Sequence, residues 1–312
     1  MPSKESDALR EHFQSVADRL AANPEMDLAT MRGILEEFSV RSAEPTRVTY
    51  EEVDAGGRPA IWCLPLERAD DRVVLYTHGG GFVTNTMHSH RKLAAHLAKA
   101  AGCRALVLDY RLAPEHSYPA QLEDALAAFT WLLERGFSAD HIALAGDSAG
   151  GNLATATALK LRDSADGAGA DRAGAAYPAA IVGFSPWYDL EATGSTMRTN
   201  AHLDALIQPG LIAGMAAGYL GADGSAKDPL ANPTYADPAG LPPMYLAVGD
   251  HETLQDSVEQ FAERARNAGV EVVLEVAEGM QHVHPFMAGR APEADRTIAD
   301  AGRWLRSKLG LN

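Results

Sequence analysis

The sequence is poor in cysteine and has no long apolar run. Only two cysteines, Cys63 and Cys103, occur among 312 residues. They lie in apolar runs typical of strands, so we expect reduced core residues and no disulfide framework. No apolar stretch approaches the roughly 18 residues that a membrane-spanning helix needs, and the N-terminus has neither an apolar signal core nor a cleavage site. These absences predict a cytoplasmic protein with no membrane span.

Basic residues are also scarce relative to acidic ones. Lysine and arginine total 27, against 42 aspartates and glutamates, which gives a net charge of −15. Nucleic acid is therefore not an expected partner, because its phosphates would be repelled. The balance mildly favours neutral or cationic ligands. Hydrophobic residues make up 46% of the chain, which is ordinary for a globular enzyme.

Short apolar runs alternate with longer helical patterns along most of the chain. The expected strands are 48–53, 60–66, 73–77, 104–109, 141–145, 180–184, 244–248 and 272–276. The expected helices are 90–101, 120–135, 150–162, 257–268 and 293–309. The pattern predicts an α/β-hydrolase type of α/β fold: an eight-stranded, mostly parallel sheet flanked by helices, with the first two strands antiparallel.

Two segments interrupt this alternation. Residues 1–45 are helical before any strand begins, and 188–242 separates the sixth and seventh strands by more than an ordinary crossover. Such excess usually forms a lid or a binding surface. We expect residues 1–45 to be N-terminal cap helices and 46–312 to be the catalytic domain, with 188–225 contributing to the cap. The stretch 163–176, rich in Ala, Gly and Asp, predicts a surface loop.

A candidate nucleophile follows the fifth strand. There the chain reads Gly-Asp-Ser-Ala-Gly over 146–150, with Ser148 at the centre and a helix behind it. In this strand–turn–helix setting a tight turn strains the serine backbone and exposes its hydroxyl. We expect Asp147 to support the turn. The alternative reading is a phosphate-binding helix N-terminus, but no Walker lysine accompanies the glycines.

A triple-glycine segment follows the third strand. It reads His-Gly-Gly-Gly-Phe over 78–82. Consecutive glycines free the backbone so that N–H groups can point into a cavity, which the oxyanion of an acyl-transfer intermediate requires. The alternative is a flexible turn, which the position at the end of a central strand disfavours. We expect His78 and Gly79 to support this loop structurally.

A base and an acid are expected at later strand ends. His282 lies just beyond the eighth strand and Glu252 just beyond the seventh. The order serine, acid, histidine is the one this fold uses. His284 is an alternative base, and Asp250 and Asp256 are alternative acids.

The remaining histidines, such as His88, His90, His96 and His116, are expected to be ordinary helix or loop residues. No histidine or cysteine pattern predicts a metal site.

Several motifs occur together in one order. They are 78–82, Asp-Tyr-Arg-Leu-Ala-Pro-Glu at 109–115, 146–150, Ser-Pro-Trp at 185–187, Asp-Pro-Leu-Ala-Asn-Pro at 228–233, Leu-Pro-Pro at 241–243 and His282. From about residue 45 to the end, the chain resembles the bacterial hormone-sensitive-lipase-like esterases, often called family IV.

The resemblance implies a specific set of site residues. Ser148 would be the nucleophile, His282 the base, and the N–H groups of Gly80, Gly81 and Ala149 the oxyanion donors. It also implies a helical N-terminal cap, no metal or organic cofactor, and a structural role for 109–115. One departure is that the family's acid is more often Asp where Glu252 stands.

The predicted function is therefore a serine carboxylesterase that acts on small, short-acyl esters through an acyl-enzyme. The same machinery suits a lactonase. A non-catalytic binding module is less favoured because no triad member is missing, and a peptidase would normally bring a gating domain. A small ester or lactone is the expected partner, and a homodimer is possible.

Overall fold

The fold is built on one twisted sheet. The computed structural model describes residues 2–167 and 177–311 of the chain. Within them the sheet has eight strands in the order β1-β2-β4-β3-β5-β6-β7-β8. The strands are β1 Val48–Asp54, β2 Pro59–Pro65, β3 Val73–Thr77, β4 Arg104–Leu108, β5 Ile142–Asp147, β6 Ala180–Phe184, β7 Met244–Gly249 and β8 Val272–Ala277. Only β2 runs antiparallel to its neighbours β1 and β4.

This sheet confirms the predicted eight-stranded, mostly parallel arrangement with an antiparallel first pair. Each expected strand is present, and its ends differ from expectation by two residues at most. Every residue of β3, β5, β6 and β7 is buried. Helices on both faces explain this, because a parallel sheet is stable only when both of its faces are covered.

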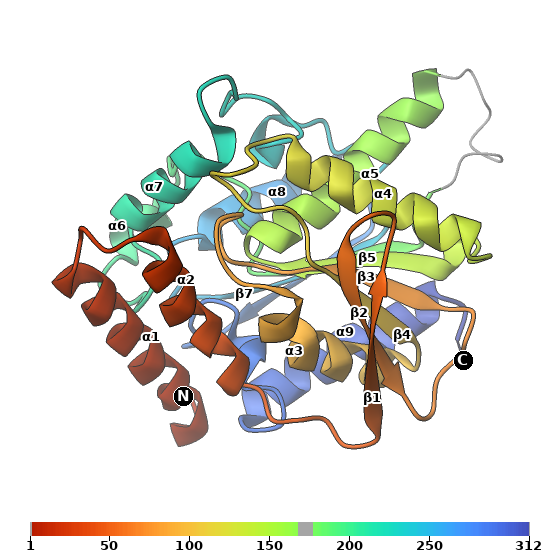
Figure 1. The fold of residues 1–312 in the computed structure, drawn as a ribbon, viewed down its shortest axis with the longest axis horizontal. Helices are drawn as coiled ribbons and strands as arrows, with labels where there is room; N and C mark the ends of the chain where they lie inside the picture. Colours follow the sequence, from red (N-terminus) through yellow and green to blue (C-terminus); the bar gives the residue numbers. More distant parts are fainter. Residues whose placement is uncertain (1, 168–176, 312) are drawn as a thin grey trace.

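The helices form two layers around the sheet (Figure 1). Helices α3 (Met87–Ala101) and α9 (Pro292–Lys308) pack together on one face. Helices α4 (Ala120–Glu134), α5 (Ala149–Gly167) and α8 (Gln255–Asn267) cover the other. Because β3 to β8 are parallel, their carboxyl ends lie at one common edge of the sheet.

Two helix ends differ from expectation by three residues or more. Helix α3 begins at Met87 and not at residue 90, because Thr86 and Ser89 form a reciprocal capping box. Helix α5 continues to Gly167, so the loop expected from residue 163 was wrong for 163–167. Alanine favours the helix, and Ser164 satisfies its hydroxyl within it by donating to the carbonyl of Lys160. The remainder of that expected loop, 168–176, lies outside the described residues.

The two segments that break the alternation contain further helices. The N-terminal segment holds α1 (Lys4–Ala22), α2 (Leu28–Glu36) and the 3₁₀ helix η1 (Glu37–Val40). The insertion after β6 holds α6 (Thr196–Thr199) and α7 (Pro209–Leu220). Figure 1 shows α1 and α2 beside α6 and α7 on one side of the molecule. These four helices come from distant parts of the sequence and lie in one region.

Short 3₁₀ helices complete the chain: η2 Ala139–His141, η4 Pro233–Tyr235 and η5 His284–Met287. Both cysteines are buried and unpaired, as expected from their apolar surroundings. In residues 2–167 and 177–311, no helix combines the length and apolarity needed to cross a membrane.

Candidate active site

Ser148 occupies the sharp turn between β5 and α5. Its φ is +51°, in the left-handed region that a residue with a side chain rarely adopts, and holding it there costs about 1–3 kcal/mol. Two backbone hydrogen bonds sustain the turn. Ser148 N–H donates to Phe184 O at 2.9 Å, and Trp187 N–H donates to Ser148 O at 2.9 Å.

The glycines of the turn are required by close packing. A Cβ on Gly150 would overlap the carbonyl oxygen of Thr77, and one on Gly146 would overlap the Gly150 carbonyl. The Thr77 hydroxyl also donates to Gly150 O at 2.7 Å, which locks β3 to the start of α5. The turn closes only because these positions lack side chains.

The triple-glycine loop lies beside this turn, because β3 and β5 are neighbours in the sheet. Gly80 and Gly81 have φ values of +112° and +62°. In the described part of the chain, neither donates its N–H to another group. Ala149 is the first residue of α5, so its N–H has no partner inside the helix. Three backbone donors are thus available near Ser148.

Asp147 ties the two loops together. Its buried carboxylate accepts hydrogen bonds from the Tyr76 hydroxyl at 2.8 Å and from Gly79 N–H at 3.2 Å. It also lies 3.2 Å from Nε2 of His90. Burial opposes ionisation, but His90 and Tyr76 outweigh it and hold the pKa of Asp147 below its ordinary 3.8. His90, expected to be an ordinary helix residue, is instead a fully buried partner of this carboxylate.

His78 supports the glycine loop from the other side. Its Nδ1 lies 2.8 Å from Gly79 O, and its ring stacks on Tyr110 with centroids 4.2 Å apart. The Tyr110 hydroxyl donates to His78 O at 2.6 Å. Burial lowers the pKa of His78 to about 3, with the nearby His90 adding to the effect, so the ring is neutral near pH 7.

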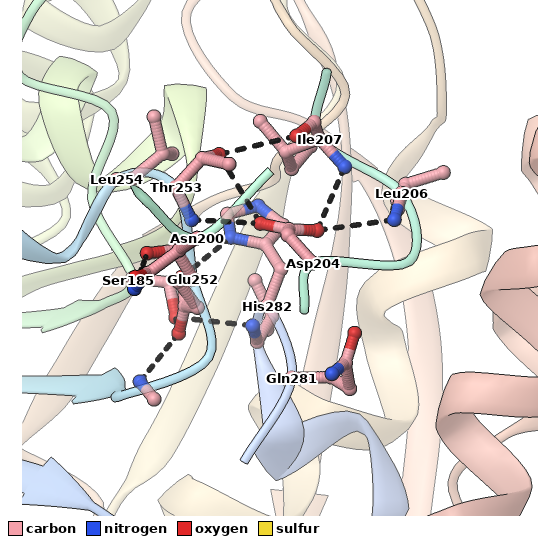
Figure 2. A network of polar contacts seen from close by, with 12 residues as sticks. Ser185, Asn200, Asp204, Leu206, Ile207, Glu252, Thr253, Leu254, Gln281 and His282 are labelled. Atoms are coloured by element: carbon pink, nitrogen blue, oxygen red, sulfur yellow. Dashed lines mark hydrogen bonds and ion pairs between the residues drawn. The ribbon is translucent and has the colours of Figure 1, made fainter. Parts of the chain in front are cut away.

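Glu252 and His282 form a buried pair at the ends of β7 and β8 (Figure 2). Nδ1 of His282 lies 2.8 Å from Oε2 of Glu252, and both side chains are at most 5% exposed. Burial alone would favour the neutral ring, but the hydrogen bond and charge of Glu252 outweigh it. With smaller contributions from Asp204 and Asp147, they raise the pKa of His282 above its ordinary 6.5.

The alternative acids and base have other partners. Asp250 accepts from Gly279 N–H at 2.5 Å. Asp256 accepts from the backbone and hydroxyl groups of Ser195 and Thr196 at the start of α6. Nε2 of His284 lies 2.8 Å from the Thr297 hydroxyl on α9. The structure therefore brings only Glu252, of these three carboxylates, to His282.

Ser148 and His282 line one cavity together with Gly80 and Gly81. In the described residues no hydrogen bond joins the Ser148 hydroxyl to the imidazole. Catalytic hydrogen bonds often become short only when substrate binds. The shared cavity thus brings the predicted nucleophile, the predicted base and two of the predicted oxyanion donors to one space.

The wall of this cavity is mostly apolar and comes from both unusual segments. Residues 1–45 contribute Phe13, Leu35 and Phe38, and the insertion contributes Leu206, Ile207, Leu211, Ile212 and Met215. Arg32 of α2 also donates to the carbonyls of Val83 and Ala113. The N-terminal helices are thereby anchored to the end of the glycine loop.

Comparison with known proteins identifies the family. A family profile described as alpha/beta hydrolase fold matches residues 74–286. A crystal structure of an esterase from the bacterial hormone-sensitive lipase family superposes with a TM-score of 0.91 at 40% identity, covering 99% of this chain and 100% of that one. The chain belongs to the bacterial hormone-sensitive-lipase family of α/β hydrolases.

Curated relatives in the family agree with this assignment. An acetyl-hydrolase of Streptomyces hygroscopicus is 36% identical over 93% of this chain and 98% of its own length. An esterase of Acinetobacter venetianus is 31% identical over 78% of each chain. The predicted family, the predicted fold and carboxylesterase activity are thus confirmed.

The departure from the family's usual Asp has a structural answer. Glu252 lies in a tight turn in which the N–H of Gly249 donates to Oε1 of Glu252 at 2.5 Å. This bond draws the longer side chain back, and Oε2 still reaches His282. The turn thus holds the longer side chain with one carboxylate oxygen on Gly249 N–H and the other beside His282.

The sequence did not predict the role of Ser185. Its hydroxyl donates to Oε1 of Glu252 at 2.7 Å and accepts from Val283 N–H at 3.0 Å. Its φ of +49° is as unusual as that of Ser148. The Ser-Pro-Trp motif at 185–187 was the available signal, but nothing local to it indicates a bond to a carboxylate 67 residues away.

No group of three or more histidine, cysteine, aspartate and glutamate side chains gathers with metal-binding geometry in the described ranges.

Proposed function

We propose that this carboxylesterase hydrolyses small, uncharged esters with short acyl chains through a serine acyl-enzyme. Ser148 is the nucleophile, His282 the general base and Glu252 the carboxylate that orients the ring. One observation carries this proposal: a buried Glu252–His282 pair, joined at 2.8 Å, borders the cavity that holds Ser148 on its strained turn.

The reaction has two steps, acylation and then deacylation of Ser148. Nε2 of His282 removes the Ser148 proton as the hydroxyl oxygen attacks the ester carbonyl, and the resulting imidazolium protonates the leaving alcohol. The acyl group is then bound to Ser148. A water molecule, deprotonated by the same ring, attacks the acyl carbonyl, and the proton returns to Ser148 as the acid leaves.

The developing oxyanion is bound by the N–H groups of Gly80, Gly81 and Ala149. Their lack of competing partners supports this role, and one such donor contributes about 3–4 kcal/mol to transition-state stabilisation. His78, Gly79 and Asp147 keep the donors in place. Without that support the loop would reorganise as charge develops.

The segments 1–45 and 188–225 act as a cap over the catalytic domain of residues 46–312. Both contribute side chains to the cavity wall, which supports the assignment. An apolar wall favours an uncharged substrate, since a charged group would lose its hydration there. Large residues such as Phe13, Trp187 and Met215 line the space and favour short acyl chains.

The nucleophile is tested with a p-nitrophenyl acetate assay and an organophosphate label. Wild-type protein should hydrolyse the ester and take up one label, which peptide mass spectrometry should find on Ser148. Ser148→Ala should be unlabelled and inactive, with an unchanged thermal melt as the control. Full activity of the unlabelled Ser148→Ala protein would refute the assignment.

The substrate range is tested with p-nitrophenyl esters from acetate to decanoate and a set of lactones. We expect kcat/KM to be highest for the shortest acyl chains. A higher value for lactones than for any open-chain ester would change the substrate class while leaving the catalytic groups as assigned.

Two further proposals concern the whole protein. We expect a homodimer, supported by β8, an edge strand in which Val273 and Val276 are exposed. Light scattering after size exclusion should give twice the chain mass of 33.2 kDa. We also expect a cytoplasmic location, which cell fractionation would test.

A further inference from the structure

One stretch of the insertion, residues 200–207, is bonded to both loops that carry the acid and the base. The amide of Asn200 donates to the carbonyl oxygens of Asp250 and Glu252 at 3.0 and 2.9 Å. On the other side, Gln281 accepts from Ala205 N–H and donates to Leu203 O, both at 2.9 Å. We call residues 200–207 the clamp segment.

Asp204 lies at the centre of the clamp segment (Figure 2). Its Oδ1 accepts from the N–H groups of Leu206 and Ile207 at 3.0 and 2.8 Å. Its Oδ2 accepts from the N–H and hydroxyl of Thr253 at 2.9 and 3.2 Å. Leu206 and Ile207 line the cavity, and Thr253 directly follows Glu252. One carboxylate therefore joins the wall of the substrate site to the residue after the acid.

A buried carboxylate is a costly way to join two loops unless its charge is used. Asp204 is 3% exposed, and an unpaired carboxylate at such depth would be strongly disfavoured. Four N–H and O–H donors compensate it, but no cation is bonded to it in the described chain. After the larger contributions of burial and Glu252, Asp204 is one of the groups that raise the pKa of His282.

We propose that Asp204 is a positioning residue for catalysis: its carboxylate fixes the Glu252 loop against the substrate wall and so holds Glu252 on the imidazole of His282. This inference rests on the proposed function, because it requires His282 to be the base. It goes beyond the triad, because it makes the insertion part of the machinery that sets the position and basicity of the imidazole.

Other charged groups around His282 must be considered for any pH effect. Glu252 faces it from the end of β7, and Asp147 acts on it from the end of β5. His90 of α3 lines the same cavity. Asp204 is the contribution from the insertion. Removing its charge alone should leave the other groups in place.

The test compares Asp204→Asn with the wild type in a kcat/KM pH profile on p-nitrophenyl acetate. Asparagine keeps the shape but removes the charge, and its NH2 group must face N–H donors on one side. We expect kcat/KM to fall by about 10- to 100-fold. We also expect the midpoint of the acid limb to move to lower pH, because the imidazolium loses a stabilising charge.

Asp189→Asn is the matched control. Asp189 is similarly buried, at 6% exposed, and accepts four hydrogen bonds. All four come from residues 191–194 of its own loop. It should lose thermal stability without moving the pH midpoint. If Asp204→Asn leaves the midpoint where Asp189→Asn and wild type have it, the inference is wrong.

A second variant covers the case in which Asp204→Asn does not fold. The Thr253 hydroxyl bonds both Asp204 and the Ile207 carbonyl, and Thr253→Val removes these links while keeping the shape and the charge. We expect a several-fold loss of kcat with an unmoved pH midpoint. Unchanged kcat would also overturn the inference. An inactive wild type would instead refute the proposed function.

Discussion

Replacing Glu252 by glutamine tests the orientation of the imidazole directly. Oε1 of Glu252 receives two hydrogen bonds, from Gly249 N–H at 2.5 Å and from the Ser185 hydroxyl at 2.7 Å. The Ser185 hydroxyl accepts from Val283 N–H, so its proton is directed at Glu252. A glutamine must therefore place its carbonyl oxygen there and turn its NH2 group towards His282.

An NH2 group beside Nδ1 reverses the hydrogen bond. Nδ1 must then accept, so the ring proton moves to Nε2, the atom that has to take the Ser148 proton. The ring is present but in the wrong tautomer. In serine hydrolases this error lowers kcat by about 10⁴-fold, which corresponds to roughly 5 kcal/mol of activation free energy. We expect a loss of that order for Glu252→Gln.

The assay is steady-state hydrolysis of p-nitrophenyl acetate, with circular dichroism to verify folding. Asp250→Asn and Asp256→Asn are the controls, because their carboxylates contact Gly279 and α6 and not His282. Each should retain kcat within about tenfold of wild type. If Glu252→Gln keeps a comparable kcat, or if either control loses as much, the orienting acid is not Glu252.

Three further predictions follow from the same structure. Because only neutral His282 can act as base and its pKa is raised, kcat/KM should rise with pH through a midpoint above 6.5; a profile flat from pH 5 to 9 would contradict this. Met215 packs against Gly81, so Met215→Ala should raise kcat/KM for hexanoate relative to acetate by about tenfold; an unchanged ratio in the ester series would exclude Met215 as a limit on acyl length. Glu293 accepts three hydrogen bonds from Ser3 and Ser6, which outweigh burial and lower its pKa to about 2. The stabilisation of the folded protein by Glu293 is thus fully present above about pH 4.5 and is lost as pH falls through about 2. Glu293→Gln should therefore lower Tm at pH 7 by roughly 2–4 °C. Equal Tm values for the variant and wild type at pH 7 would show that the hydrogen bonds from Ser3 and Ser6 to Glu293 do not stabilise the fold.

The parts of the site that sequence predicts are those controlled by local sterics. Gly146 and Gly150 are needed because Cβ atoms there would overlap neighbouring backbone, and Ser148 must then adopt its left-handed φ. These requirements concern residues that are consecutive in the sequence, 146–150. The strand–turn–helix pattern could therefore be recognised without knowing any distant contact.

The acid shows where local reasoning stops. Strand order places a carboxylate after β7, but Asp250, Glu252 and Asp256 all satisfy that condition within one short stretch. The choice depends on partners elsewhere in the chain. Asp256 accepts a hydrogen bond from Thr196 at the start of α6, and Asp250 accepts one from Gly279 N–H. Only the tertiary structure shows that Glu252 is left to contact His282.

Asp204 and Ser185 lie beyond sequence reasoning for a related reason. Each joins segments far apart in the chain: Thr253 lies 49 positions after Asp204, and Val283 lies 98 positions after Ser185. The insertion has no periodic pattern that fixes which of its residues faces the sheet. Since Asp204 bonds the substrate wall and the acid loop with one carboxylate, a change in the wall that moves this residue must also move the acid. On the roles proposed for Glu252 and Asp204, substrate range and catalytic geometry are therefore coupled through the insertion of this chain.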